Sequence, residues 1–350
     1  MAKAFDLTQW ARPEMLALAP YTSARDTFTA KTGKYTLLDA NENPNASAVN
    51  RYPDPNQLAL KKKIGALRAC SVNQLLIGNG SDEILDLLFR AFCTPNKDNV
   101  ILMPPTYGMY AVLANINGVG IKEVPLTADF QLKTDEILAA VDSNTKAIFF
   151  CSPNNPSGNV FKTSDITALL NGFDGLVVID EAYIDFTDRL GWLSQLDNYP
   201  NLVVTQTLSK AFGLAGLRLG IAIAHPSIIK LLHTIKPPYN INTLSQQQAI
   251  EVLSDIEKVN RQIAALLAER NRVAAYLNEL DWVETVFPSD ANFLLIRVDD
   301  ANKRYDALLA QKVVVRNRSK QTNCENTLRI SIGTPVENNE LMAACNTISL

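Results

Sequence analysis

The stretch T-L-S-K-A-F-G-L-A-G-L-R-L-G, residues 207–220, decides how the rest of the chain is interpreted. It places Lys210 beside the hydroxyls of Thr207 and Ser209, with Arg218 eight residues further on. The apolar run L-V-V just before it predicts a buried strand. Burial lowers the pKa of a lysine amine, and the neutral amine is the form that condenses with an aldehyde. Hydroxyls and an arginine suit a phosphate. The combination favours a binding site for pyridoxal phosphate over the alternative interpretation, a surface turn that carries a solvated lysine.

This wording resembles the cofactor-lysine segment of fold-type I pyridoxal-phosphate-dependent aminotransferases, and within them the histidinol-phosphate aminotransferase family. Matching motifs extend from Pro20 to Gly333. The resemblance implies amino transfer from L-histidinol phosphate to 2-oxoglutarate, giving imidazole acetol phosphate and glutamate in histidine biosynthesis. It also implies a homodimer that shares its active sites.

Composition limits the classes of function. The 350 residues are 47% hydrophobic and 20% charged with a net charge of −3, which predicts a soluble protein without a nucleic-acid partner. No secretory signal or membrane span is evident, so a cytoplasmic location is expected. The five cysteines have no regular spacing and the two histidines match no metal pattern, which disfavours disulfides and a metal-dependent hydrolase.

Short apolar runs alternate with helical patterns in the middle of the chain, which is typical of an α/β fold with a mostly parallel sheet. Strands are predicted at residues 100–103, 147–151, 176–180, 202–204 and 219–224, and helices at 81–92 and 163–170. We expect a large domain at residues 35–240. Residues 1–34 and 241–350 are expected to form an arm and a smaller α+β domain. The latter would have a long helix over 244–280 and strands at 293–298, 313–315 and 327–332.

The motif D-E-A-Y places Asp180 at the carboxyl end of an apolar strand. A carboxylate in that position carries a desolvation cost unless it meets a cation, and a protonated pyridinium nitrogen is such a cation. Tyr183 could donate a hydrogen bond to the phenolic oxygen of the same ring. The alternative is a carboxylate that only caps a neighbouring helix.

Three loops carry further candidates. Asn155 lies in S-P-N-N-P-S-G, a turn signal by itself, and the resemblance assigns it to the phenolic oxygen. Gly80, Ser81 and Asp82 open a predicted helix whose free N–H groups suit a phosphate, although Ser81 acting as a plain N-cap explains the pattern equally well. The resemblance favours phosphate binding there. Tyr107 matches the family position that stacks on the pyridine, and a core tyrosine is the alternative.

The remaining candidates concern substrate and partner. In the family, the residue matching Tyr52 reaches the cofactor phosphate of the neighbouring subunit. Arg329 alternates with apolar residues on a predicted strand and therefore needs an anion, and the resemblance places the acidic group of the substrate there, with Arg316 as a second candidate. Tyr21 and Asn43 also match sequence motifs of the family and are candidates for the substrate pocket.

Two alternatives share this fold: an aromatic amino-acid aminotransferase and a phosphothreonine decarboxylase. A non-catalytic sensor module of a transcription regulator would need an additional DNA-binding domain, for which 350 residues leave no room. A plain nucleotide-binding protein is disfavoured because no G-x-G-x-x-G follows the first predicted strands.

Overall fold

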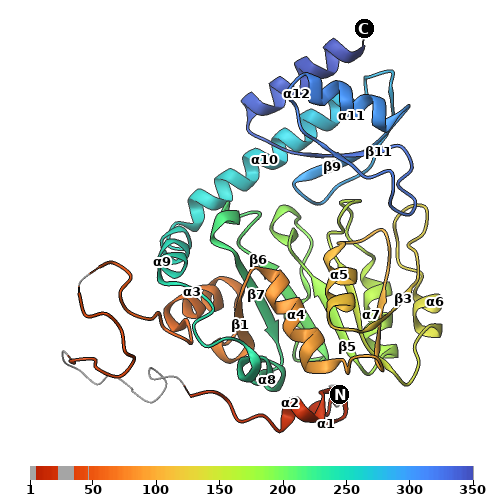
Figure 1. Ribbon diagram of the computed structural model, residues 1–350. Coiled ribbons are helices and arrows are strands. Elements are labelled where there is room, and N and C mark those ends of the chain that lie inside the picture. Colours follow the sequence, from red (N-terminus) through yellow and green to blue (C-terminus); the bar gives the residue numbers. More distant parts are fainter. Residues whose placement is uncertain (1–4, 23–34, 46, 350) are drawn as a thin grey trace.

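The computed structural model describes residues 5–22, 35–45 and 47–349, and two sheets dominate it (Figure 1). The larger sheet has seven strands in the order β1-β7-β6-β5-β4-β2-β3. Its strands are β1 Leu75–Asn79, β2 Asn99–Leu102, β3 Gly120–Glu123, β4 Thr145–Cys151, β5 Leu176–Asp180, β6 Leu202–Thr207 and β7 Leu219–Ala224. The pairs from β3 through β2, β4 and β5 to β6 are parallel, whereas β7 runs antiparallel to both β6 and β1.

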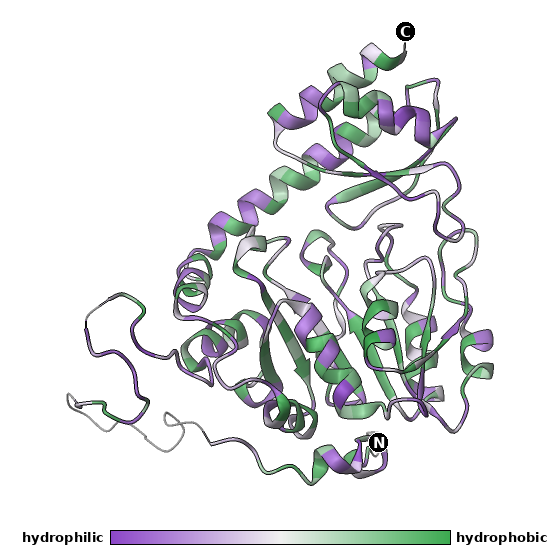
Figure 2. Ribbon diagram, viewed as in Figure 1, coloured by the Kyte–Doolittle hydropathy of each residue, from purple (hydrophilic) through white to green (hydrophobic). Residues whose placement is uncertain are grey.

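The apolar runs that predicted strands are confirmed as β2, β4, β5, β6 and β7. These strands are buried on both faces and appear as hydrophobic ribbons within the large sheet (Figure 2). Strands β1 and β3 were not predicted; β3, with the sequence G-I-K-E, lies at the sheet edge and is only partly buried.

Helices cover the large sheet. They are α3 Leu58–Arg68, α4 Ser81–Phe92, α5 Met109–Ile116, α6 Thr134–Ala139, α7 Thr163–Gly172 and α8 Pro226–Ile235, with 3-10 turns at η1 Val72–Gln74, η2 Ile184–Phe186, η3 Trp192–Gln195 and η4 Ala215–Leu217. The predicted helix over 81–92 is confirmed at both ends, and its apolar face packs against β1 and β7. Near the N-terminus, α1 Leu7–Trp10 and α2 Pro13–Leu16 are single turns, while residues 23–34 of the expected arm lie outside the described part.

The single long helix expected over 244–280 is wrong. Two helices occupy this region, α9 Thr243–Val252 and α10 Ile256–Leu277. The chain breaks between them because Asp255 starts a new helix: its carboxylate accepts a hydrogen bond from the backbone N–H of Lys258 at 3.1 Å. Helix α10 then leads from the large sheet to the smaller one (Figure 1).

The smaller sheet is antiparallel, in the order β10-β11-β9-β8. It comprises β8 Val283–Val286, β9 Phe293–Val298, β10 Arg316–Asn317 and β11 Thr327–Ser331, covered by α11 Ala301–Ala310 and α12 Pro335–Ser349. The strand predicted at 313–315 is wrong: pairing begins only at Arg316, and Val314 is 73% exposed. The fold-type I α/β architecture with a smaller α+β part is confirmed, while the domain boundary at residue 240 stays a prediction.

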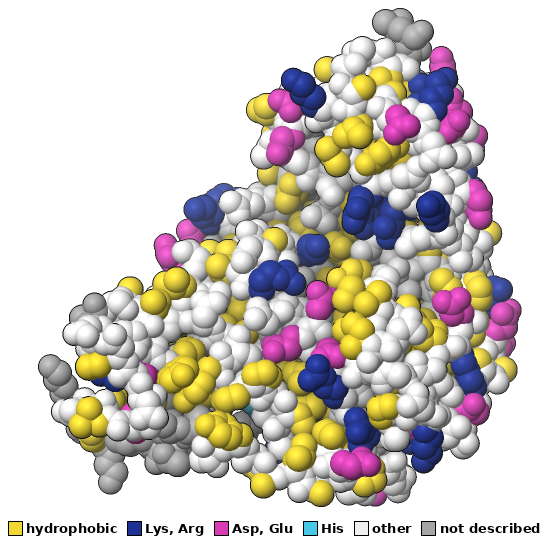
Figure 3. All heavy atoms as spheres, in the orientation of Figure 1, with side chains coloured by type: hydrophobic (Ala, Val, Ile, Leu, Met, Phe, Trp, Pro, Cys, Tyr) yellow, Lys and Arg dark blue, Asp and Glu magenta, His cyan; other side chains and the backbone are white. Residues whose placement is uncertain are grey.

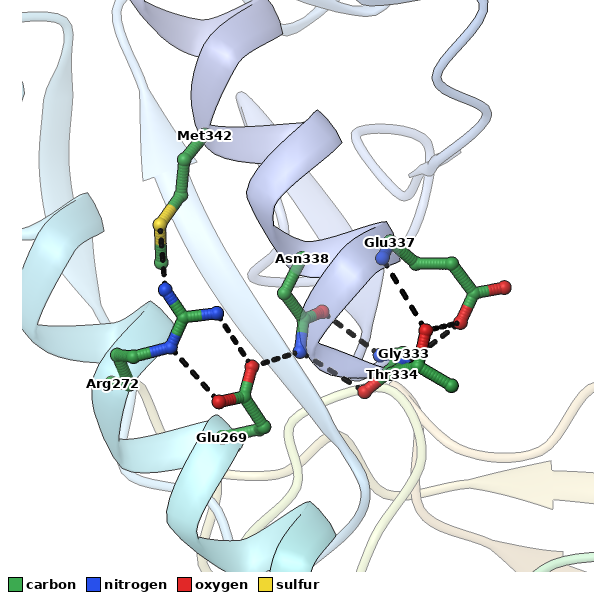
Figure 4. A network of polar contacts seen from close by, with 7 residues as sticks. All are labelled: Glu269, Arg272, Gly333, Thr334, Glu337, Asn338 and Met342. Atoms are coloured by element: carbon green, nitrogen blue, oxygen red, sulfur yellow. Dashed lines mark hydrogen bonds and ion pairs between the residues drawn. The ribbon is translucent and has the colours of Figure 1, made fainter.

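A polar network fixes the start of α12 against α10 (Figure 4). Thr334 and Glu337 form a capping box, in which the Thr334 N–H donates to the Glu337 carboxylate at 2.7 Å and the Glu337 N–H donates to the Thr334 hydroxyl at 3.3 Å. Asn338 donates to Glu269 of α10 at 2.7 Å, and Arg272 holds the same carboxylate. The return of the chain after β11 is thereby tied to the helix that connects the two sheets.

Candidate active site

A pocket lies where the loops after the parallel strands meet the start of α4. It collects candidates from distant parts of the sequence because the carboxyl ends of β4, β5 and β6 reach the same edge of the sheet. In Figure 1 this edge faces the small sheet. The lining residues are Ser81, Asp82, Tyr107, Cys151, Asn155, Asp180, Ala182, Tyr183, Thr207, Ser209, Lys210 and Arg218.

Asp180 forms the buried floor of this pocket and is 2% exposed. Its carboxylate accepts hydrogen bonds from the Tyr110 hydroxyl at 3.0 Å and from the Ala182 N–H at 3.1 Å. Burial raises the pKa of Asp180 to about 6, although these donors oppose the shift. No Lys, Arg or His among the described residues forms an ion pair with it. The site therefore offers a desolvated carboxylate that a bound cation would stabilise.

Lys210 stands in the loop beyond β6, three residues after the strand ends, and it is more exposed than the preceding apolar run suggested. Its ammonium lies 5.6 Å from the centre of the Tyr183 ring. Desolvation lowers the pKa of Lys210, and the positive charge of Arg329 lowers it further. Both effects favour the neutral amine, which is the nucleophilic form.

The N-terminus of α4 forms a candidate anion-binding site, the α4 cradle, which consists of Gly80, the first-turn N–H groups and Arg218. The N-cap is Gly80, with φ +80°, and no side chain caps the helix, so the alternative that Ser81 is the N-cap is wrong. A Cβ at Gly80 would lie 2.5 Å from the Arg218 guanidinium, and one at Gly220 would collide with the Gly80–Ser81 peptide. The missing side chains leave the first-turn N–H groups and Arg218 side by side, which suits a phosphate.

The two hydroxyls of the lysine loop differ in their hydrogen bonds. Thr207 donates to the carbonyl of Leu219 at 3.1 Å and accepts the N–H of Ser209 at 3.1 Å, so this hydroxyl already shapes the turn. Arg218 follows η4 with φ +56° and lies 3.6 Å from the Asp82 carboxylate, which holds it at the cradle. Ser209 is the hydroxyl better placed to donate to an anion.

Two tyrosines and an asparagine complete the pocket. The Tyr107 hydroxyl donates to Asp82 at 3.0 Å, and the Tyr183 ring meets Phe293 of β9 edge-on at 5.2 Å. The buried Asn155 accepts a hydrogen bond from Nη1 of Arg329 at 2.6 Å. The last two contacts join the pocket to the small sheet and bring Arg329 to its edge.

Arg329 and Gly80 border the pocket without lining it, and four other candidates are also absent from the lining. Tyr52 is 50% exposed and stacks on Tyr239 with ring centres 4.4 Å apart. Tyr21 is 72% exposed over a separate hollow. The Asn43 side chain accepts hydrogen bonds from Asn45, and the Asn43 carbonyl accepts one from the Asn50 side chain at 3.2 Å. Arg316 is exposed on β10, opposite Arg329.

The sequence did not single out three residues of the pocket. Tyr110, completely buried on α5, holds Asp180, and Cys151 and Ala182 line the cavity. Tyr107 precedes α5 and its ring meets the Tyr110 ring edge-on at 5.5 Å, so the nearby aromatic pair was the available signal that both lie at the same site. Within the described residues, no group of three His, Cys, Asp or Glu is arranged to hold a metal ion, and no helix is long and apolar enough to cross a membrane.

The sheet, the strand-end carboxylate and the lysine loop are the features expected of the fold-type I class. The aminotransferase class I and II family matches residues 28–345, and the chain belongs to this family. It is 55% identical over 335 residues to histidinol-phosphate aminotransferase of Flavobacterium johnsoniae, covering 95% of this chain and 96% of the relative, and 51% identical to that of Christiangramia forsetii, covering 98% of each.

Solved structures agree on the fold. Histidinol-phosphate aminotransferase of Sinorhizobium meliloti in complex with pyridoxal-5'-phosphate superposes with a TM-score of 0.78 at 23% identity, covering 85% of this chain and 83% of that one. L-threonine-O-3-phosphate decarboxylase of Porphyromonas gingivalis gives 0.72 at 23% identity, covering 86% and 91%. At this identity both comparisons establish the architecture alone.

The buried Asp180 makes a testable prediction about stability. Because its folded-state pKa of about 6 exceeds the ordinary aspartate pKa of about 4, its ionisation penalises folding. The penalty is absent below about pH 4, grows as the pH rises through 6 and reaches about 3 kcal/mol above it. Asp180→Asn should therefore raise the free energy of unfolding of the ligand-free protein at pH 8 by up to that amount, and change it little at pH 4.

Urea denaturation at both pH values and one protein concentration measures this difference. Asp185→Asn is the matched control, because Asp185 pairs with Arg68 at 2.7 Å and its neutralisation should lower stability at pH 8. An Asp180→Asn protein that is less stable than wild type at pH 8 would contradict the assignment.

Proposed function

We propose that the protein is a pyridoxal-phosphate-dependent aminotransferase that transfers the amino group of L-histidinol phosphate to 2-oxoglutarate. The observation that carries the proposal is the convergence of Lys210, Asp180 and the α4 cradle in one pocket. The lysine and the buried carboxylate suit the reaction of the aminotransferase family. The names of relatives at 51% and 55% identity support the choice of L-histidinol phosphate as the substrate.

The residues present fit pyridoxal phosphate. The uncapped N-terminus of α4 with Ser209 and Arg218 would hold the phosphate, and Asp180 would pair with the ring nitrogen. Asn155 and Tyr183 are the proposed partners of the phenolic oxygen, and Tyr107 would stack on the ring. When bound, the cofactor supplies an aldehyde for amines and a ring that withdraws electrons from the substrate's α-carbon.

Each of the pocket residues would then have a separate role in the reaction. Lys210 would hold the cofactor through its amine, and its Nζ would act as the general base toward the proton on the substrate's α-carbon. Asp180 would keep the ring nitrogen protonated because the buried carboxylate is stabilised by that positive charge. Arg329, with Arg316, would bind the anionic end of the substrate, and Tyr21 and Asn43 remain candidates for the pocket entrance.

The test is a stopped-flow scan of amino donors that follows the visible absorbance of the cofactor bound to the purified enzyme. Histidinol phosphate and glutamate should both remove this absorbance quickly, and 2-oxoglutarate should restore it. Lys210→Ala should slow this conversion at least about 100-fold because the general base is lost. Lys62→Ala, at an exposed position of α3, is the control and should behave as wild type.

Other outcomes point to the alternatives. Fast conversion by phenylalanine or tyrosine but none by histidinol phosphate would indicate an aromatic aminotransferase. Carbon dioxide released from phosphothreonine would indicate a decarboxylase. Wild-type rates in Lys210→Ala would refute the role of the lysine.

We also propose a cytoplasmic homodimer in which Tyr52 serves the partner's site. Cys70, Cys93, Cys151 and Cys324 form no disulfide, as is usual in reducing compartments. The exposed Tyr52 stacks on the half-buried Tyr239 beside a hollow that the exposed Val49 and Leu244 also line. Tyr52 does not line the pocket of its own chain, and the family resemblance directs it to the partner's phosphate.

Subunit mixing tests this arrangement. Lys210→Ala and Tyr52→Ala proteins, each impaired alone, should regain activity after exchange because one of the two sites in a heterodimer is intact. Random pairing predicts about a quarter of the wild-type activity. Mixing Lys210→Ala with Asp180→Asn is the control and should restore nothing, because both lesions fall in the pocket of the same chain. No recovery after verified exchange would refute the sharing of sites.

A further inference from the structure

The small sheet presents arginines on the face opposite its own core. Leu328 and Ile330 of β11 enter that core, so Arg329 between them lies on the other face. The ladder places Arg316 opposite Arg329, and a backbone hydrogen bond of 2.9 Å from Arg318 to the neighbouring strand extends the pairing. Arg316 and Arg318 are two positions apart and therefore share this face. Figure 3 shows Lys and Arg side chains gathered below the small sheet, over the hollow toward the large one.

These arginines lack anionic partners. Among the described residues, no carboxylate forms an ion pair with Arg316, Arg318 or Arg329. Arg329 donates to Asn155, but its buried Nε has no acceptor. Arg318 has a buried Nε without an acceptor as well, and no hydrogen bond of its guanidinium is found within the described residues. A buried donor without an acceptor is costly, so both side chains are arranged for a ligand that accepts hydrogen bonds.

Their charges act on one another and on the pocket. Burial lowers the pKa of Arg318, and the positive charges of Arg329 and Arg316 lower it further. Tyr183, which lines the pocket, interacts electrostatically with both Arg318 and Arg329. Arg318 therefore belongs to the electrostatic surroundings of the candidate active site, and like charges held together favour a multivalent anion.

We propose that Arg318 is a specificity-determining residue that binds the substrate's phosphate together with Arg316 and Arg329. The inference rests on the proposed function, and it identifies the residue by which the enzyme would select a phosphorylated amino donor. A phosphate monoester carries more than one negative charge at neutral pH and three acceptor oxygens, whereas the distal carboxylate of glutamate carries one charge and two oxygens. Two guanidinium groups are enough to bind both oxygens of the carboxylate. The third guanidinium finds an acceptor only when the ligand is a phosphate.

The experiment compares the two half-reactions in the holoenzyme. Arg318→Gln should lower kcat/KM for histidinol phosphate about ten- to a hundredfold, as expected for the loss of a charge-assisted contact, and lower it less than about threefold for glutamate. Arg318→Lys keeps the charge without the fork and should give an intermediate loss. Inorganic phosphate, tested as a competitive inhibitor of the glutamate half-reaction, should inhibit Arg318→Gln about tenfold more weakly than wild type.

Arg297→Gln is the matched control. Arg297 lies on the same face of β9, but its donors are taken by the carbonyls of Glu325 and Asn323 at 3.2 and 3.1 Å. Its loss should leave the ratio of the two kcat/KM values unchanged. Equal losses for both donors in Arg318→Gln, or no loss, would overturn the proposal, as would unchanged phosphate inhibition. A wild-type enzyme that does not convert histidinol phosphate would refute the proposed function, whereas phosphate inhibition weakened in Arg318→Gln would still support the phosphate site.

Discussion

The carboxylate of Asp180 lies at the buried end of β5, where water cannot stabilise its charge. Tyr110 and the Ala182 amide donate hydrogen bonds to it, yet its pKa remains raised to about 6, because two neutral donors do not replace a cation. The folded chain thus maintains an unfavourable group at the centre of its pocket. A positively charged ring nitrogen bound there would stabilise this group, and would couple the stability of the fold to the proposed cofactor.

The sheet topology arranges everything else around this carboxylate. Because β4, β5 and β6 are parallel neighbours, Asp180 at the end of β5 lies between the loops that carry Asn155 and Lys210. The chain then returns along the antiparallel β7, which brings Arg218 against Gly80 at the start of α4. Fourteen residues, 207–220, therefore contain both Lys210 and Arg218, the arginine that we propose for the phosphate. The small sheet closes the site from the other side through Arg329.

Local patterns predicted the parts of the fold whose cause is local. The strands buried on both faces and helix α4 follow from apolar runs and periodicity, and the motifs identified loops that the fold brings together in one pocket. The long helix failed because a single capping residue, Asp255, divides it, and the run of valines at 313–315 is apolar without being paired. Tyr110 and Arg318 were missed because their roles depend on a distant carboxylate and on strand register, neither of which a single segment reveals.

The most direct measurement is the titration of the Asp180 carboxyl by carbon-13 NMR, with Asp180→Asn used to assign the signal. In the ligand-free protein the carboxyl should titrate with a pKa of about 6. After pyridoxal phosphate binds, the pKa should fall below its ordinary value of about 4, because the pyridinium charge favours the ionised form. A pKa near 4 without the cofactor, or one that the cofactor leaves unchanged, would contradict the account.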